Sequence, residues 1–482
     1  MKKKRIVALA MTAAMCAGLL AGCGNDSNEG GSTSEDGVVT LKWVTVGNGM
    51  PDNYDAWLEQ VNPYLEEKIG VNVDMEVVGW GDWDNRRSVI TNSGEYFDIL
   101  FTDQTRFSSE VSNGVFLDIT DMLQETTPEL YELIPEDYWK AVSSDSKIYG
   151  VPTMKDNAIT EYFVWDKDIA DKYGIDINAI TDFDSLYPAL QKIKEGEGTA
   201  PFFMSKAGAS VLIDMNFDDL SSGSKVIGVK YGDDGATVVN PLDDPDILAN
   251  LETIHKMYSE GLINGDAPTA DDTNKYHMLF IAQGWSGAAK TTWGPNFGIA
   301  NCEAVQFGDS VMCNKTIQGS INGIYSGCKN PEKALELLQL INTDTKLRDL
   351  FYFGVEGEDW QYTDDNKVER LETDWALAGY TQGNTYIVSQ QTTEETSQWD
   401  EVIALNDAAV RSGLLGFSMD TSEVTTQLAN CNAVYEKYYP ELFTGAQEPN
   451  ALIEKMKGEL ETAGWDELCA AAQEQVDEFM GK

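Results

Sequence analysis

The stretch VTLKWVTV at residues 39–46 opens a pattern that decides the fold. Apolar residues recur at helical spacing over 57–69, and Gly70 then stands where a helix would end. The next stretch, VNVDMEV at 71–77, alternates apolar and polar residues as a half-buried strand does, and FDILF at 97–101 supplies a third strand. Strands that alternate with helices at this interval pair in parallel through crossover helices, so the pattern predicts an α/β lobe.

The chain as a whole is large and strongly acidic. Its 482 residues suffice for two or three domains, and 34 Lys plus Arg against 80 Asp plus Glu give a formal charge of −46. That balance argues against nucleic-acid binding, which needs a basic surface, and against docking on anionic lipid through protein charge. A hydrophobic content of 42% is too high for a disordered acidic chain, so we expect a folded protein.

The cysteines and histidines suggest no metal centre. Seven cysteines and two histidines are scattered without a Cys-x-x-Cys pair, so we expect neither a metal site nor a cofactor. Cys302 and Cys313 could form a disulfide if they lay on adjacent strands, but free thiols packed as small core residues are the simpler interpretation.

The N-terminus has the features of an export signal. The basic residues 2–5 precede an apolar run over 6–20, which is shorter than a membrane span needs. The run ends in Leu20-Ala21-Gly22-Cys23, which resembles the lipobox of bacterial lipoproteins. The resemblance implies a signal peptide over 1–22 and a lipid-modified Cys23; the alternative is an ordinary secreted precursor.

A Gly-, Ser- and acid-rich segment follows Cys23. Residues 23–38 cannot form a core, and the fourteen residues 24–37 would span on the order of 20 Å as a flexible chain. We therefore expect a lipid-anchored protein of Gram-positive type, whose tether holds a folded body at the extracellular face of the cytoplasmic membrane. The lipid would be its sole membrane contact.

Later segments keep the mixed α/β character. A Gly/Asp turn at 232–235 between two apolar stretches predicts a hairpin, and Asn330-Pro331 predicts a helix start. Near the end, apolar residues at helical spacing on both sides of Gly464 predict two amphipathic helices that form a C-terminal helical module.

Five short motifs occur in a characteristic order: SGEYFDI at 93–99, GVFLDI at 114–119, KIYGVP at 147–152, the Trp-containing stretch 284–293, and NPEKA at 330–334. In this order they resemble the extracellular solute-binding proteins of bacterial carbohydrate ABC importers, the group related to maltose-binding protein. The resemblance covers nearly all of the chain after Cys23.

A narrower resemblance lies toward the C-terminus. YFGVEG at 352–357, YYPELFTG at 438–445 and the stretch from 463 to 475 are similar to a Gram-positive lipoprotein subgroup tied to oligosaccharide uptake.

The resemblance implies a two-lobed, periplasmic-binding-protein-like α/β fold with a hinge and an inter-lobe cleft. One lobe would comprise 39–154 plus 290–325, and the other 155–289 plus 326–482. A monomer would close about its hinge on an oligosaccharide and deliver it to the permease subunits and ATPase of an ABC importer.

Sugars present apolar faces and a rim of hydroxyl groups, so a sugar site needs aromatic platforms beside planar polar side chains. Trp80-Gly81-Asp82-Trp83 follows the second strand in an expected loop, and Thr102-Asp103 follows the third, where open α/β sheets place ligands. For each tryptophan the alternative is a core or surface position. The candidate ligand-binding residues are Trp80, Asp82, Trp83, Thr102, Asp103, Lys155, Asn157, Trp285, Trp293, Glu356, Trp360, Trp375 and Asn384.

Two other functional classes stay open. A secreted glycoside-active enzyme would also be acidic and rich in tryptophan, but the chain has no Gly-x-Ser-x-Gly, His-Glu-x-x-His or Walker motif, and we expect no catalytic residue. The acidic stretch 362–366 lacks the spacing of a calcium loop and predicts a solvated turn. The second alternative is a peptide-binding lipoprotein.

Overall fold

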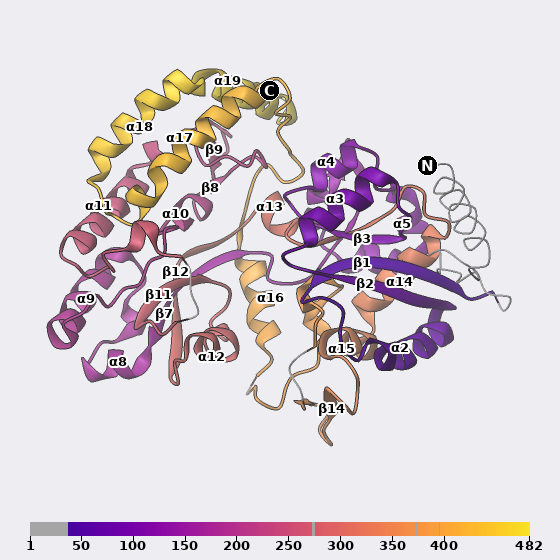
Figure 1. The fold of residues 1–482 in the computed structure, drawn as a ribbon. Helices are drawn as coiled ribbons and strands as arrows, with labels where there is room; N and C mark the ends of the chain where they lie inside the picture. Colours follow the sequence, from indigo (N-terminus) through magenta and orange to yellow (C-terminus); the bar gives the residue numbers. More distant parts are fainter. Residues whose placement is uncertain (1–36, 272–274, 372–374, 395) are drawn as a thin grey trace, which may run out of the picture.

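The computed structural model describes residues 37–271, 275–371, 375–394 and 396–482. They form two lobes, each built on its own β-sheet and joined by several segments (Figure 1). The expected signal peptide over 1–22, the lipidation site Cys23 and most of the expected tether lie outside the described residues. The prediction of a two-lobed α/β fold with C-terminal helices is confirmed.

The first lobe is built on a five-stranded sheet in the order β2-β1-β3-β13-β6. β1 pairs in parallel with β2 along its whole length and with β3 on its other side, whereas β13 runs antiparallel to β3 and β6. The predicted pair of parallel strands is therefore confirmed. The strands are β1 (Val39–Gly47), β2 (Val71–Gly79), β3 (Ile99–Thr102), β6 (Val151–Pro152) and β13 (Ile321–Ile324).

The crossover between β1 and β2 is α2 (Tyr54–Ile69). Its residues Trp57, Val61 and Leu65 are buried at intervals of four, so one helical face covers the sheet. The helix ends at Gly70, whose φ of 69° is the left-handed conformation that glycine adopts without a steric penalty.

Two later helices also belong to the first lobe (Figure 1): α14 (Pro331–Thr343) and α15 (Thr345–Phe353). They pack on α2, and the buried indole N–H of Trp57 donates to the carbonyl of Leu350 at 2.8 Å. The expected boundaries instead placed residues 326–482 in the second lobe. The difference arises because the apolar face of α14 is buried in the first-lobe core, against α2 and α5, and local sequence cannot reveal which core a helix joins.

The other first-lobe elements are short. They are α3 (Trp83–Ser93), α4 (Phe107–Ser112), α5 (Thr120–Thr126), α6 (Pro128–Leu133), α7 (Glu136–Ala141), the pair β4 (Ser143–Ser144) and β5 (Lys147–Ile148), the pair β14 (Trp360–Tyr362) and β15 (Val368–Arg370), and the single turns η5 (Gly379–Thr381) and η6 (Thr385–Ile387).

The second lobe has a four-stranded sheet in the order β11-β7-β12-β16. β7 is central, antiparallel to both β11 and β12, and its side chains are buried on both faces. β12 therefore lies in the second lobe, although the expected boundaries gave 290–325 to the first. The strands are β7 (Ile159–Asp166), β11 (Leu279–Gln283), β12 (Cys302–Met312) and β16 (Val410–Arg411).

Helices cover both faces of this sheet. They are α8 (Lys167–Lys172), η1 (Ile177–Ala179), α9 (Phe183–Glu197), α10 (Val211–Asp214), α11 (Pro245–Ser259), η3 (Ala267–Thr269), η4 (Ala289–Trp293) and α12 (Gly294–Phe297). The turn η2 (Pro241–Asp243) precedes α11, and its Leu242 is buried in the separate core that contains the C-terminal helices.

The C-terminal helices α17 (Thr425–Phe443), α18 (Pro449–Ala463) and α19 (Trp465–Phe479) pack together on the second lobe (Figure 1). Gly464 separates the last two, as predicted. The helices share a core with a small sheet in the order β10-β9-β8, which contains the predicted hairpin. Its strands are β8 (Phe217–Asp218), β9 (Gly228–Lys230) and β10 (Val238–Val239).

Within the described residues, three segments cross between the lobes. The first joins β6 to β7, the second joins β12 to β13 through α13 (Asn314–Ile317), and the third reaches β16 through α16 (Gln398–Ala408). Figure 1 shows α16 standing between the lobes.

The described cysteines are free thiols: Cys302 begins β12 and Cys313 directly follows its last residue, so the two do not lie on adjacent strands. No helix in the described ranges has the length and apolar character needed to cross a membrane.

We expect Trp57→Ala to lower the free energy of unfolding by roughly 3–5 kcal/mol, because it empties the contact between α2 and α15. Trp80→Ala is the matched control: its side chain is 51% exposed, so we expect a loss below about 1 kcal/mol. Urea unfolding followed by circular dichroism measures both, and equal losses would contradict the placement of α15.

A second prediction concerns pH. Glu161 in β7 is 2% exposed, and burial, reinforced by the charge of Asp214, raises its pKa to about 8. Between about pH 4.5 and 8 the folded protein therefore holds a proton that the unfolded chain has released, and stability falls as pH rises through this window. Glu161→Gln keeps a neutral side chain in both states. We expect its stability loss from pH 5 to pH 8 to be smaller than that of the unsubstituted protein by on the order of 2 kcal/mol.

The control for this experiment is Glu303→Gln, in the half-buried part of β12 paired with β7. If Glu161→Gln and Glu303→Gln showed the same pH dependence of urea unfolding as the unsubstituted protein, burial of a protonated Glu161 would be excluded.

Candidate ligand-binding site

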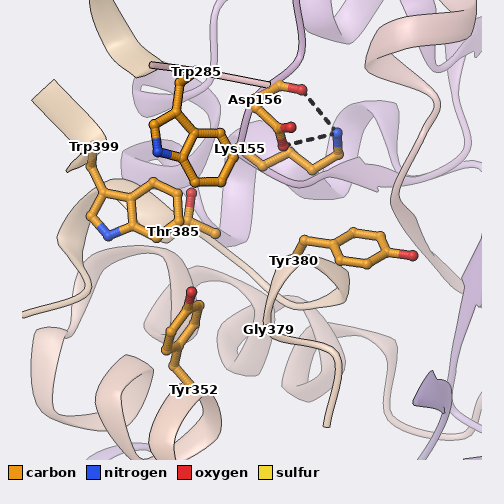
Figure 2. A pocket seen from close by; sticks show the side chains of 8 residues that line it. All are labelled: Lys155, Asp156, Trp285, Tyr352, Gly379, Tyr380, Thr385 and Trp399. Carbon is orange, nitrogen blue, oxygen red and sulfur yellow. Dashed lines mark hydrogen bonds and ion pairs between the residues drawn. The ribbon is translucent and has the colours of Figure 1, made fainter. Parts of the chain in front are cut away.

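A cavity of about 370 Å³ lies at the junction of the two lobes. The first lobe contributes α15 and the turns η5 and η6, the second contributes the loop after β11, and the first and third crossings supply the remainder. Figure 2 shows its lining side chains. The lining residues are Lys155, Asp156, Trp285, Tyr352, Gly379, Tyr380, Thr385 and Trp399.

Aromatic rings dominate the cavity. Trp285 and Trp399 lie together on one side, with ring centroids 6.0 Å apart and planes inclined at 39°. Tyr352 stands edge-on to Trp399, at 6.1 Å and 89°. Rings at several inclinations offer flat apolar surfaces to a ligand in more than one orientation.

The fourth ring, Tyr380, links the cavity to the exposed Trp80. The two rings lie nearly parallel, at 16° and 6.3 Å, and the Trp80 indole N–H donates to Asn48 Oδ1 at 3.1 Å. Burial raises the pKa of Tyr380 to about 12, so its hydroxyl stays a hydrogen-bond donor at neutral pH. Trp80 and Tyr380 thus extend the aromatic surface from the cavity to its rim.

The loop that carries Tyr380 is held against the end of β1. Asn48 N donates to the carbonyl of Ala376 at 2.8 Å, and Gly47 forms an isolated antiparallel β-bridge with Leu377. A Cβ atom at Gly47 would lie 2.5 Å from the Ala376 oxygen, so only glycine permits this approach.

A cation and a carboxylate face the cavity from the first crossing. Lys155 Nζ donates to the backbone oxygen of Asp156 at 3.1 Å and lies 3.5 Å from its carboxylate (Figure 2). The lysine therefore keeps donor capacity, and the carboxylate keeps acceptor capacity, for ligand hydroxyl groups.

A buried arginine supports this wall. Arg348 is fully buried in α15; its Nε donates to the carbonyl of Asn384 at 3.0 Å and its Nη2 to that of Gly379. Its guanidinium lies 5.3 Å from the ring centre of Tyr352. Burial lowers the pKa of Arg348 to about 10, which leaves it charged at neutral pH. The Arg348 side chain thus contacts Tyr352 and the residues that begin η5 and cap η6, and it holds them together.

The first crossing is fastened in the same region. Thr385 N donates to the carbonyl of Met154 at 2.8 Å, and Thr385 Oγ1 donates to the same oxygen at 2.9 Å. Asn406 in α16 donates to the carbonyl of Lys155 and to the hydroxyl of Tyr386, both at 2.6 Å. These bonds fix the backbone from which Lys155 and Asp156 project.

The structure distributes the residues predicted from the sequence over several environments. Lys155 and Trp285 line the cavity, Trp80 lies at its rim, and Asp82 is exposed at the start of α3. Trp83 is 5% exposed and packs on Phe101.

Thr102 and Asp103 belong to a buried charged cluster. Thr102 Oγ1 donates to Glu110 Oε2 at 2.6 Å, and Arg87 bridges Glu110 at 2.7 Å and Asp103 at 3.4 Å. These ion pairs offset the free-energy cost of burying the charge of Arg87.

Five other predicted residues pack in the protein interior. The indole N–H groups of Trp360 and Trp375 donate to the carbonyls of Gly354 and Phe351, and Trp293 packs on Tyr162. The amides of Asn157 and Asn384 donate to the carbonyls of Thr153 and Asn342. Their hydrogen-bonding and packing roles are structural in this conformation.

Glu356 lies elsewhere, in a groove of about 360 Å³ between α2 and α15. Its backbone N–H and carbonyl pair with the amide of Gln60, at 2.9 Å each, and Lys346 lies 3.7 Å from its carboxylate.

Sequence reasoning missed six lining residues. Four of them come from segments that the expected boundaries placed in the other lobe, far from the first sheet, and Asp156 and Trp399 carried no motif. Tyr352 offered a signal, because it opens the subgroup motif at 352–357. The missed residues are Asp156, Tyr352, Gly379, Tyr380, Thr385 and Trp399.

Two lobes, three crossings and an aromatic cavity at their junction define a protein of the two-lobed ligand-capture class. The chain belongs to the family of bacterial extracellular solute-binding proteins, whose model matches residues 47–346. The family predicted from the motifs is therefore confirmed. Residues 413–481, which include the C-terminal helices, match a model described only as a domain of unknown function.

Similar proteins span essentially the whole chain. A carbohydrate ABC transporter substrate-binding protein of Streptococcus pneumoniae is 28% identical over 99% of this chain and 98% of its own. The crystal structure of an N-glycan transport solute-binding protein of S. pneumoniae has a TM-score of 0.83 at 26% identity, over 92% of this chain and 99% of that one. The same protein in complex with Man5GlcNAc gives 0.68 at 26% identity, over 92% and 98%.

We expect Arg348→Met to loosen the cavity wall, because the methionine cannot donate to Gly379 and Asn384. Backbone amides over 379–387 should exchange with solvent about tenfold faster, measured by hydrogen–deuterium exchange mass spectrometry. Lys346→Met, an exposed change on the same helix, is the control and should leave these amides unaffected. Unchanged exchange in Arg348→Met would contradict the supporting role.

Proposed function

We propose that this protein captures an extracellular oligosaccharide in the cavity at the lobe junction and delivers it to an ABC importer. The observation that carries the proposal is the lining itself: four aromatic rings beside a lysine, a carboxylate and a threonine. Apolar ring faces match the C–H faces of sugars, and the polar side chains match their hydroxyl groups. The similar S. pneumoniae proteins, named for carbohydrate and N-glycan transport, support the same ligand class.

The lining favours capture over cleavage. Asp156 is the one carboxylate among the described residues that line the cavity, whereas most glycoside hydrolases need two carboxyl groups on opposite sides of the scissile bond. The family consists of substrate-binding transport proteins, and we propose that this member likewise leaves its ligand intact.

Hinge closure is the proposed motion. Aromatic rings from both lobes line the cavity. A ligand that contacts Trp285 and Tyr380 at the same time therefore favours the conformation in which the lobes are closer together.

The place of action follows from the family and from the N-terminal motif. The family is extracellular, and we propose that a lipid on Cys23 anchors the protein outside the cytoplasmic membrane as a monomer. Its partners would be the permease subunits and the ATPase that drives them.

The test is binding without cleavage. We expect a thermal-shift panel that includes Man5GlcNAc to show stabilisation by an oligosaccharide, and chromatography to recover that sugar uncut. Trp285→Ala and Trp399→Ala should each weaken binding by about 2 kcal/mol, roughly thirtyfold in Kd by calorimetry, because each removes a stacking surface.

Tyr276→Ala is the control for these variants, since it removes a 50% exposed aromatic ring that does not line the cavity. Stabilisation by peptides but by no sugar would overturn the ligand class. Shorter sugars in the chromatogram would overturn the assignment as a binding protein.

A further inference from the structure

The cavity residue Trp285 projects from a short loop between β11 and a helical stretch. Gly284 N donates to the carbonyl of Thr160 at 3.0 Å, and the N–H groups of Ala288 and Ala289 bond back to Trp285 and Ser286. The loop therefore forms the first turn of a helix that continues through η4. At such a turn the first backbone N–H groups have no partner within the helix and need an acceptor from outside.

Glu401 supplies that acceptor from α16. Its Oε1 accepts from Ser286 N at 2.7 Å and its Oε2 from Gly287 N at 3.1 Å. Both carboxylate oxygens are thus used on consecutive peptide groups. Hydrogen bonds to an ionised group are stronger than neutral ones, and a two-point attachment also fixes orientation.

The packing around Gly287 makes this attachment sensitive to position. A Cβ atom at Gly287 would lie 3.1 Å from Cδ1 of Trp285 and 3.6 Å from Oε2 of Glu401. Carboxylate, glycine backbone and indole are therefore in close contact. A shift of the loop relative to Glu401 must move the indole.

The same helix also touches Trp285 directly, because Trp399 packs on it. The indole N–H of Trp285 is buried and has no hydrogen-bond partner among the described residues, and it lies against the loop backbone, where a Cβ atom at Gly287 would be 3.2 Å from Nε1. The direction of that N–H then depends on how the loop is held.

The far end of α16 is fastened to the first crossing. Besides donating to the carbonyl of Lys155, Asn406 accepts from Ala158 N at 2.8 Å. One helix thus holds the Trp285 loop at its start and the backbone of Lys155 at its end.

We infer that Glu401 is a positioning residue, which sets the orientation of Trp285 in the cavity and links it, through α16, to the first crossing between the lobes. Glu401 itself does not line the cavity. Its contribution to affinity rests on the proposed function, whereas its effect on Trp285 does not.

The experiment compares two variants that differ in the number of acceptor oxygens left at position 401. Glu401→Gln retains one acceptor oxygen, and Glu401→Ala retains none. The matched control is Asp400→Asn, which removes the same charge from an exposed position on the same helix. Gly287→Ala displaces the indole from the other side. All are prepared with 5-fluorotryptophan, and Trp285→Phe assigns the Trp285 resonance.

In the ligand-free protein we expect the Trp285 fluorine resonance to shift or broaden in Glu401→Ala and Gly287→Ala, to change less in Glu401→Gln, and to stay unchanged in Asp400→Asn. Binding of Man5GlcNAc should weaken about tenfold in Glu401→Ala, with thermal unfolding of the ligand-free protein little changed, because the released N–H groups lie near solvent.

An unchanged Trp285 resonance in Glu401→Ala would overturn the inference, as would a moved resonance with unaltered Man5GlcNAc affinity. Failure of the unsubstituted protein to bind Man5GlcNAc or any other oligosaccharide would count against the proposed function, while the ligand-free resonance would still decide whether Glu401 orients Trp285.

Discussion

Hydrogen bonds to the backbone at Met154 and Lys155 are the constraint on which the site depends. The chain leaves the first sheet at β6 and enters the second at β7, and only a few residues separate the strands. Thr385 and Asn406 bind the carbonyls within this link, from a first-lobe turn and from α16. These bonds hold the part of the link that carries the lysine and the carboxylate of the cavity.

Each lobe contains buried ionisable groups that are held in place by their neighbours. In the first lobe, Arg348 binds backbone carbonyls instead of a carboxylate, and Arg87 is paired with Glu110. In the second, burial favours the neutral form of Glu161. Such groups cost free energy unless their surroundings compensate them, and they stay in place only where many neighbours fix them together. Rigid lobes and a localised hinge are what a protein that closes on a ligand requires.

The tryptophans show how far site prediction from sequence can go. Composition and motifs predicted that aromatic rings would bind the ligand, and Trp285 does line the cavity. Trp360 and Trp375 carry the same side chain, but their indole N–H groups bond backbone carbonyls in the core. Trp285 differs from Trp360 and Trp375 in its solvent exposure, and that exposure depends on which distant elements cover the ring. Tyr380 reaches the cavity because Gly47 lets its loop approach β1, a contact between residues more than 300 positions apart.

The sequence by itself determined the local elements and the family. Alternation in β2, the buried face of α2 and the glycine stops at 70 and 464 follow from side-chain periodicity and backbone sterics, which act over a few residues. Only the tertiary structure decided that α14 and α15 return to the first lobe, that β12 joins the second sheet, and that Tyr352, Tyr380 and Trp399 meet Trp285. Those outcomes depend on which apolar faces fit against each other across hundreds of residues, and a linear pattern of apolar positions specifies that a face will be covered without specifying by what.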